Sequence, residues 1–425
     1  MESLKGKKLL ILGGNVLSCD IVLQAKAMGI YTIVTDWYDT QRSPAKLLAD
    51  EYWMDSIEDY DTLLRKIREE HIDGVITGFT DSYLLPYHHI CELAGLPCYG
   101  TKEQFEVLTN KDSYKALCRE YGVPTICQYD LGDPDICYPV LVKPVDGSGS
   151  RGITICNDFD ELQMAVKAAE VSSKRGKYII ERYMDGREVT VFWLFADGRY
   201  HLAAIGNRHV KRNQGNDVIP LPVGYTFPSV FTPKYVSDVM PNAERMFAAM
   251  GIRNGMMFMQ CKVENDICYV YDIGYRLTGS LEYKIFERVC GFNPLEMLIR
   301  FALTGKMAEE DISSKIDPVG MLPSFNVSCL CAPGVIGEIA GCEQVKDMDG
   351  VIDVVLSHFP GQAITEQMRG LLAQITVRVL GTVSSKEDLY PAMDRIDNII
   401  RIISEDGRDL SLPGIELQDI EGFVL

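Results

Sequence analysis

Strand-like and helical segments alternate along the first hundred residues, and this alternation restricts the possible folds more than any other feature of the chain. Two short β-rich runs, KLLILGG and YTIVTDW, are joined by a helical segment over about residues 18–28. A second helical segment, DYDTLLRKIREEHI, leads into the strand-like run GVITGF. Strands that are separated by helices form a parallel, doubly wound sheet. The N-terminal part is therefore predicted to be an α/β layer.

The length and composition of the chain indicate a globular protein with several domains. At 425 residues the chain is too long for one ordinary core, so two to four domains are expected. A net charge of −18 argues against binding to nucleic acid or to an anionic membrane, since both need a basic surface. The thirteen cysteines include no CxxC pair, and no apolar run is long enough to span a bilayer. We therefore expect a cytoplasmic protein with reduced thiols and with no nucleic-acid or membrane partner.

The stretch LVKPVDGSGSRGI, residues 141–153, places a lysine at the end of a strand and just before a loop of small residues. Glycine and serine let backbone N–H groups approach an anion closely, because no large side chain blocks them. Lys143 supplies a positive charge for phosphate oxygens. The Walker pattern GxxxxGK[ST] is absent, since here the lysine precedes the loop. Alone, the stretch fits a phosphate-binding hairpin and an ordinary glycine-rich hairpin equally well.

Three further motifs follow the expected order of one known superfamily. They are TNKDSYK at residues 109–115, IIERYMDGREV at residues 179–189 and MFMQCKVENDICYVYDIGYRLTGS at residues 257–280. Together with Lys143 and its loop, these motifs resemble the ATP-grasp superfamily. The resemblance covers nearly the whole chain. It is strongest to carboxylate–amine ligases with the architecture of L-amino acid ligases and biotin carboxylases.

This resemblance implies a nucleotide site for ATP. Lysines are expected at the phosphates, a hinge strand holds adenine through its backbone, and an acid binds the ribose hydroxyls. The residues that match these positions are Lys111, Lys143, Ser148, Gly149, Ser150, Gly152, Glu181, Tyr183, Met184 and Glu188. Without the other motifs, Lys111 would be interpreted as a solvated residue at a helix start.

The resemblance also implies a site for Mg²⁺, with Mn²⁺ as a possible substitute, on the hairpin at residues 257–274. Two acids and an asparagine are usual there, whereas this chain has Gln260, Asp272 and Gly274. Glutamine offers a carbonyl oxygen but no charge, so we expect weaker metal binding, or one ion where relatives hold two. Lys262 replaces an apolar position under the base, and two alternatives stay open: its stem lies there, or it faces solvent.

Two groups of basic residues are candidates for the acyl and carboxylate groups. Arg276 matches an arginine that steadies the acyl phosphate, and we assign it a catalytic role together with Lys143. A structural ion pair is the alternative for Arg276. The segment GNRHVKR contains Arg208, His209, Lys211 and Arg212, which fit either an acidic-substrate wall or a solvated loop. His209 is a weaker candidate for a general base.

The implied fold is α/β and α+β, the three-domain ATP-grasp architecture with an N-terminal doubly wound parallel sheet. We expect an N-terminal α/β domain over residues 1–110, an ATP-grasp domain over 111–305 and a C-terminal α+β lobe over 306–425. A small mobile lobe at about 113–186 should close over ATP. The resemblance further implies a homodimer.

The implied activity is an ATP-dependent, ADP-forming ligase that joins a small carboxylate, such as an amino acid, to an amine through an acyl phosphate. Its partners are then small-molecule carboxylate and amine substrates. Two alternatives are a catalytically weakened nucleotide-binding protein, suggested by Gln260 and Gly274, and an ATP-grasp carboxylase.

Overall fold

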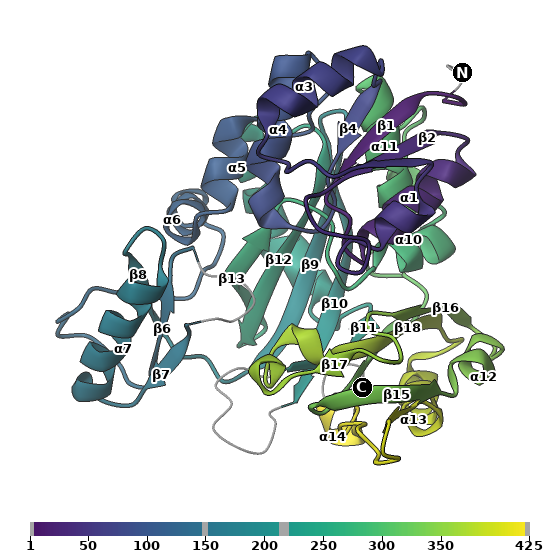
Figure 1. The fold of residues 1–425 in the computed structure, drawn as a ribbon. Helices are drawn as coiled ribbons and strands as arrows, with labels where there is room; N and C mark the ends of the chain where they lie inside the picture. The colour runs from purple at the N-terminus through teal and green to yellow at the C-terminus, as the bar shows by residue number, and fades with distance from the viewer. Residues whose placement is uncertain (1–3, 147–151, 212–220, 421–425) are drawn as a thin grey trace.

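A parallel sheet forms the N-terminal part of the structure, a computed structural model that describes residues 4–146, 152–211 and 221–420 (Figure 1). The strand order is β3-β2-β1-β4. The strands are β1 (Lys8–Leu12), β2 (Tyr31–Thr35), β3 (Glu51–Trp53) and β4 (Gly74–Ile76), with helices α1 (Ser18–Ala27), α2 (Ala45–Leu48), α3 (Tyr60–Glu69) and α4 (Leu84–Ala94). The predicted α/β class with a parallel N-terminal sheet is confirmed.

An antiparallel sheet of eight strands forms the centre of the molecule, in the order β13-β12-β9-β10-β11-β14-β18-β16. Its strands are β9 (Arg187–Ala196), β10 (Arg199–Lys211), β11 (Leu221–Phe227), β12 (Gly255–Glu264), β13 (Ile267–Gly274), β14 (Ser324–Leu330), β16 (Val351–Leu356) and β18 (Ile375–Thr382). The accompanying helices are α8 (Thr232–Asp238), α9 (Met240–Ala249), α10 (Tyr283–Cys290) and α11 (Pro294–Thr304). Strands on both sides of residue 305 therefore share one sheet.

A small four-stranded sheet, ordered β5-β8-β6-β7, lies to one side of the central sheet (Figure 1). It contains β5 (Gln128–Tyr129), β6 (Val140–Pro144), β7 (Thr154–Cys156) and β8 (Tyr178–Arg182), and helix α7 (Phe159–Ser172) packs on it. Helices α5 (Lys102–Leu108) and α6 (Lys111–Tyr121) precede it. Its apolar core, which includes Val140, Val142 and Leu162, is separate from the main core. A lobe with its own core can move as a unit.

The C-terminal segment adds a three-stranded sheet in the order β17-β15-β19. Its elements are β15 (Gly334–Ala340), β17 (Ala363–Ile364), β19 (Arg401–Ser404), α12 (Cys342–Lys346), α13 (Leu389–Ile399) and α14 (Leu417–Ile420). Ile336, Ile364 and Ile402 are buried between these strands. Over the described ranges, no helix has the length and apolar character needed to cross a membrane.

Two local signals position the functional residues. The Asn110 side chain accepts hydrogen bonds from the backbone N–H groups of Asp112 and Ser113, which starts α6, and Gly122 ends it at φ 74°. Asn265 and Asp266 both have positive φ and form the two-residue turn between β12 and β13. The helix start expected at Lys111 and the hairpin expected at residues 257–274 are therefore confirmed.

Candidate functional site

A cleft of about 1180 Å³ lies where the small lobe, the N-terminal sheet and the central sheet meet. Nearly all of the described residues predicted for the site line it: Lys111, Lys143, Glu181, Tyr183, Met184, Glu188, Gln260, Asp272 and Arg276. Gly152 does not line the cleft, although its neighbour Ile153 does. Ser148, Gly149 and Ser150 lie outside the described residues. Segments far apart in the sequence thus converge on one space.

A buried triad of charges lies in the small-lobe wall of this cleft. The Nζ of Lys143, on β6, is 2.8 Å from Oε2 of Glu181 on β8, and the ammonium of Lys115 contacts the other oxygen, Oε1. Burial, followed by repulsion from Lys111, lowers the pKa of Lys143 to about 7. The three side chains are at most 6% exposed. Lys143 is therefore held facing the cleft, but its charge is partly neutralised by Glu181.

Lys115 was not among the predicted residues. It lies one turn after Lys111, between Tyr114 and Cys118 on the buried face of α6. A lysine on an inward helix face needs a buried acid, and this spacing is the signal that could have identified it. Burial, followed by repulsion from Lys143, holds the pKa of Lys115 well below its ordinary value.

The predicted metal residues face one another across the β12–β13 hairpin. Gln260 pairs directly with Asp272 in the register. Oδ1 of Asp272 is 3.8 Å from Nζ of Lys111 and accepts a hydrogen bond of 3.4 Å from the Tyr114 hydroxyl. Among the described residues, no three His, Cys, Asp or Glu side chains form a metal cluster. One carboxylate and one amide oxygen suit a hard cation that takes its other ligands from phosphates and water.

The structure leaves little room for a side chain at position 274, where an asparagine was expected. A Cβ atom on Gly274 would lie 2.3 Å from the Phe258 ring. The same ring lies 5.1 Å from the guanidinium of Arg276. Phe258 therefore occupies the space that a third metal ligand on this strand would need.

Glu188, the predicted ribose acid, is already surrounded by partners. It contacts the guanidinium of Arg208, its Oε1 is 2.8 Å from Nζ of Lys262, and Tyr271 donates a hydrogen bond of 3.1 Å. Burial opposes ionisation, but Arg208 and Lys262 hold the pKa of Glu188 below its usual value. From the sequence, two alternatives stayed open for Lys262, with its stem under the base or its side chain facing solvent. In the structure its ammonium group binds Glu188, which neither alternative included.

Arg276 joins the central sheet to the N-terminal part. Its Nε and Nη2 each donate a hydrogen bond of 2.7 Å to Asp81, and Nη1 donates one to the carbonyl of Leu277. The fork geometry matches the carboxylate, as it would match a phosphate. The ion pair that was the structural alternative is thus present. A role for Arg276 at the acyl phosphate stays a prediction. For that role the guanidinium would have to release Asp81, or bind Asp81 and the phosphate at the same time.

The basic segment on β10 divides between two faces of its strand. Arg208 lines the cleft, whereas His209 is buried away from it, with Nδ1 2.8 Å from the Asp419 carbonyl and Nε2 2.8 Å from the Thr226 hydroxyl. His209 is therefore not a general base of this cleft, and the suggestion is corrected. Lys211 lies 3.0 Å from Glu416 in an ion pair, and Arg212 lies outside the described residues.

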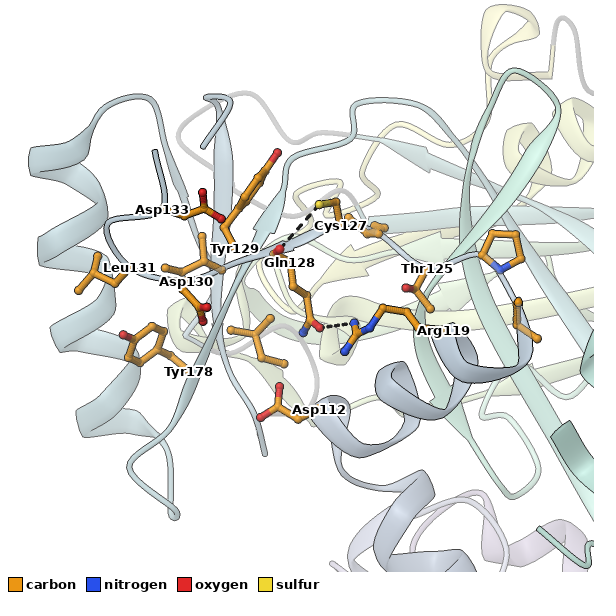
Figure 2. A pocket seen from close by; sticks show the side chains of 16 residues that line it. Asp112, Arg119, Thr125, Cys127, Gln128, Tyr129, Asp130, Leu131, Asp133 and Tyr178 are labelled. Carbon is orange, nitrogen blue, oxygen red and sulfur yellow. Dashed lines mark hydrogen bonds between the residues drawn. The ribbon is translucent and has the colours of Figure 1, made fainter. Parts of the chain in front are cut away.

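A second hollow of about 810 Å³ lies behind the hinge, between the end of α6 and the edge of the small sheet (Figure 2). Arg119 and Gln128 point toward one another there and form a hydrogen bond of 2.6 Å. None of the residues predicted for the nucleotide or the metal lines this hollow. The candidate site is therefore the central cleft alone.

Comparison with known proteins identifies the domain that contains most of these residues. Residues 136–281 match the family model of the ATP-grasp domain. The chain is similar to the 2-oxoglutarate carboxylase small subunit of Hydrogenobacter thermophilus, with 27% identity over 49% of this chain and 49% of that protein. It is 30% identical to a formate-dependent phosphoribosylglycinamide formyltransferase of Sulfurisphaera tokodaii over 44% of this chain and 49% of that protein. These matches thus span about half the length of either relative.

Solved structures resemble the chain over nearly its full length. An L-amino acid ligase from Bacillus licheniformis superposes with a TM-score of 0.75 at 21% identity, covering 94% of this chain and 99% of that one. The biotin carboxylase domain of the Hydrogenobacter thermophilus 2-oxoglutarate carboxylase, in a complex with MgADP, ADP and bicarbonate, gives 0.76 at 18% identity and coverages of 95% and 91%. The chain therefore contains an ATP-grasp domain and has the fold of the ATP-grasp ligases.

Proposed function

We propose that the protein is an ATP-dependent, ADP-forming ligase that joins a small carboxylate to an amine through an acyl phosphate. The observation that carries the proposal is the convergence of Lys111, Lys143, Gln260 and Asp272 in one cleft of an ATP-grasp fold. Two lysines supply positive charge for phosphate oxygens, and the hairpin supplies oxygen ligands. The likeness to an L-amino acid ligase over 94% of the chain supports the amine as acceptor.

The proposed reaction depends on positioning and charge more than on a nucleophilic side chain. Lys111 and Lys143 would hold the ATP phosphates while the carboxylate attacks the γ-phosphorus. Gln260 and Asp272 would hold Mg²⁺, which would supply positive charge for the phosphates, and we expect Mn²⁺ to substitute. The small lobe at about 113–186 would close over the nucleotide and exclude water.

The proposal extends to the organisation of the protein. It includes the division at residues 110 and 305, a cytoplasmic location and a homodimer. In this division the strands after residue 305 complete the central sheet, so the C-terminal lobe would form one wall of the cleft, not a separate module.

Two other functions have specific support. A weakened nucleotide-binding protein would explain the single carboxylate on the hairpin and the Phe258 ring beside Gly274. A carboxylase-type enzyme is suggested by the relative named a 2-oxoglutarate carboxylase small subunit. The ligase differs from both in needing an amine for turnover.

Phosphate release from ATP and Mg²⁺ by the purified chain tests the proposal. The reaction would be screened against pooled amino acids, other small carboxylates, bicarbonate and amines, with Lys143→Ala as the inactive control. We expect release that needs one carboxylate and one amine, and that the variant abolishes. Release with bicarbonate but no amine would favour the carboxylase, and tight ATP binding without release in any pool would favour the nucleotide-binding protein.

A further inference from the structure

A row of polar side chains crosses the central sheet from the nucleotide residues toward the C-terminal lobe. In the strand register Lys262 pairs with Glu188, Glu188 with Arg208, Arg208 with Tyr225, and Tyr225 with Asn326. Directly opposed residues on neighbouring strands place their side chains on the same face of a sheet. The row therefore follows one face of the sheet away from the ATP side of the cleft.

At the far end of this row, a buried glutamate has an oxygen without a hydrogen bond. Glu282 lines the cleft at the start of α10 and is 1% exposed. Thr278 donates to its Oε2, whereas Oε1 has no partner of normal geometry in the described structure, although the Ser280 hydroxyl lies nearby. A buried carboxylate oxygen without a donor is costly, so it marks a place for a ligand's donor.

A buried arginine with spare donors lines the same part of the cleft. Arg378, on β18, is 7% exposed and faces the cleft beside Ser328, its opposite residue on β14. Its Nη1 donates a hydrogen bond of 2.9 Å to the Ser328 hydroxyl, and this is the one hydrogen bond of its guanidinium among the described residues. Guanidinium has five N–H donors, so most are available to an anion.

A contact between the sheet and the loop before α10 fixes these two groups relative to each other. Nδ2 of Asn326 donates a hydrogen bond of 2.5 Å to the carbonyl of Ser280. Ser280 lies two residues before Glu282, and Asn326 lies two residues before Ser328, the partner of Arg378. One acceptor and one set of donors therefore face the same cleft.

We propose that Glu282 and Arg378 form the receptor for the amine substrate, and that this substrate also carries a carboxylate, as an α-amino acid does. Oε1 of Glu282 accepts a hydrogen bond from the ammonium, and the guanidinium of Arg378 donates to the carboxylate. This assignment rests on the proposed ligase function and names the class of its acceptor. It uses residues outside every motif that pointed to ATP.

Glu282 also has the position of a proton acceptor for the coupling step. The ammonium transfers one proton to the Glu282 carboxylate and becomes a neutral amine. Its lone pair attacks the carbonyl carbon of the acyl phosphate, forming the C–N bond, and the C–O bond to phosphate breaks with its electron pair on the phosphate. The phosphate takes the second proton from nitrogen, and Glu282 returns the first to solvent.

The test separates activation of the carboxylate from recognition of the amine. Hydroxylamine traps the acyl phosphate as a hydroxamate without needing the amine receptor, and ligation is followed by product mass. Each proteinogenic amino acid is compared with its methyl ester, which lacks the negative charge. Arg378→Met should raise the KM for the amino acid about tenfold to a hundredfold, which is the loss of a charge-assisted hydrogen bond, and leave the KM for the ester unchanged.

Three further variants make the result specific. Glu282→Gln should retain hydroxamate formation and lose ligation, because the amide cannot accept the proton. Arg378→Lys, which retains the charge, should recover part of the affinity. Arg369→Met removes a surface arginine that pairs with Glu366 at 2.9 Å, and it should have no effect. Unfolding midpoints identify any variant that fails to fold.

Direct binding distinguishes failure of this inference from failure of the proposed function. Amino acids and esters are titrated into the wild-type chain and Arg378→Lys in the presence of a non-hydrolysable ATP analogue. Hydroxamate formation by the wild-type chain, together with amino-acid binding that does not depend on Arg378, would overturn the receptor and retain the ligase. Arg378-dependent binding of amino acids without hydroxamate from any carboxylate would overturn the ligase and retain the receptor. Equal affinity for acids and esters in both proteins would overturn the receptor.

Discussion

Replacing Lys115 with methionine should weaken ATP binding although Lys115 lies behind the cleft wall and does not line the cleft. When both lysines are protonated, two ammonium groups share one carboxylate, and the triad of Lys115, Glu181 and Lys143 has a net charge of +1. Without Lys115, the carboxylate of Glu181 neutralises the ammonium of Lys143, and the net charge of this remaining pair is zero. The phosphates then meet no excess positive charge from this triad.

The expected size of the effect follows from the ion pair that Lys143 must weaken in order to bind a phosphate. In the variant Lys143 no longer shares Glu181 with a second ammonium, so binding a phosphate means giving up part of its undivided 2.8 Å ion pair, while its 3.3 Å hydrogen bond to the Tyr271 carbonyl remains. A hydrogen bond to a charged group contributes about 1.5–3 kcal/mol, so the Kd for ATP should rise about tenfold to a hundredfold. The chain should still fold, because Glu181 retains one partner in its buried position.

Calorimetric titration near pH 6 measures the effect, because Lys143, with a pKa of about 7, is then mostly protonated. Adenosine is the matched ligand, since it has the base and ribose but no phosphates. Lys115→Arg should restore ATP affinity, and Lys102→Met, at an exposed pair with Glu106, should leave it unchanged. Equal losses for adenosine and ATP would refute the charge argument and assign Lys115 a structural role.

Three further predictions concern the hairpin and the buried histidine. Gln260→Glu adds a charged ligand and should lower the Mg²⁺ concentration for half-maximal ATP turnover about tenfold, and no change would argue against a metal here. Gly274→Asn should reduce the free energy of unfolding by about 1–3 kcal/mol in urea titrations, because the new side chain meets Phe258. Burial lowers the pKa of His209 to about 4, so stability should fall by about 3 kcal/mol as the pH drops from 6.5 to 4. His209→Gln should flatten that pH profile in thermal melts.

Local patterns predicted the elements that carry the site. Helix α6 follows from an asparagine cap and a glycine stop, and the β12–β13 hairpin follows from two alternating runs around a polar turn. Each of these signals consists of residues that are close together in the chain, so each can be recognised in a single sequence. The order of the motifs then placed Lys143 and Asp272 in one cleft, as the structure has them.

Long-range pairing explains what the sequence did not reveal. Arg276 matched an expected position, but its partner Asp81 is 195 residues away and lies in the N-terminal part, between β4 and α4. Arg378 gave no signal at all, because its neighbours in the cleft come from β14 and from the start of α10. Position within a strand shows which residues share a face, whereas it does not show which strand will be the neighbour.

The departures from the expected hairpin ligands also have a different meaning in three dimensions. In the sequence, Gln260 and Gly274 are two independent replacements of expected metal ligands. In the structure, Gly274 leaves room for the Phe258 ring, and that ring lies against the guanidinium of Arg276, which Asp81 holds by two hydrogen bonds. Restoring an asparagine would disturb this packing before it could supply a ligand. If the hairpin holds a metal, as we propose, its packing therefore suits a site with one carboxylate, and adding a second ligand at position 274 would require repacking.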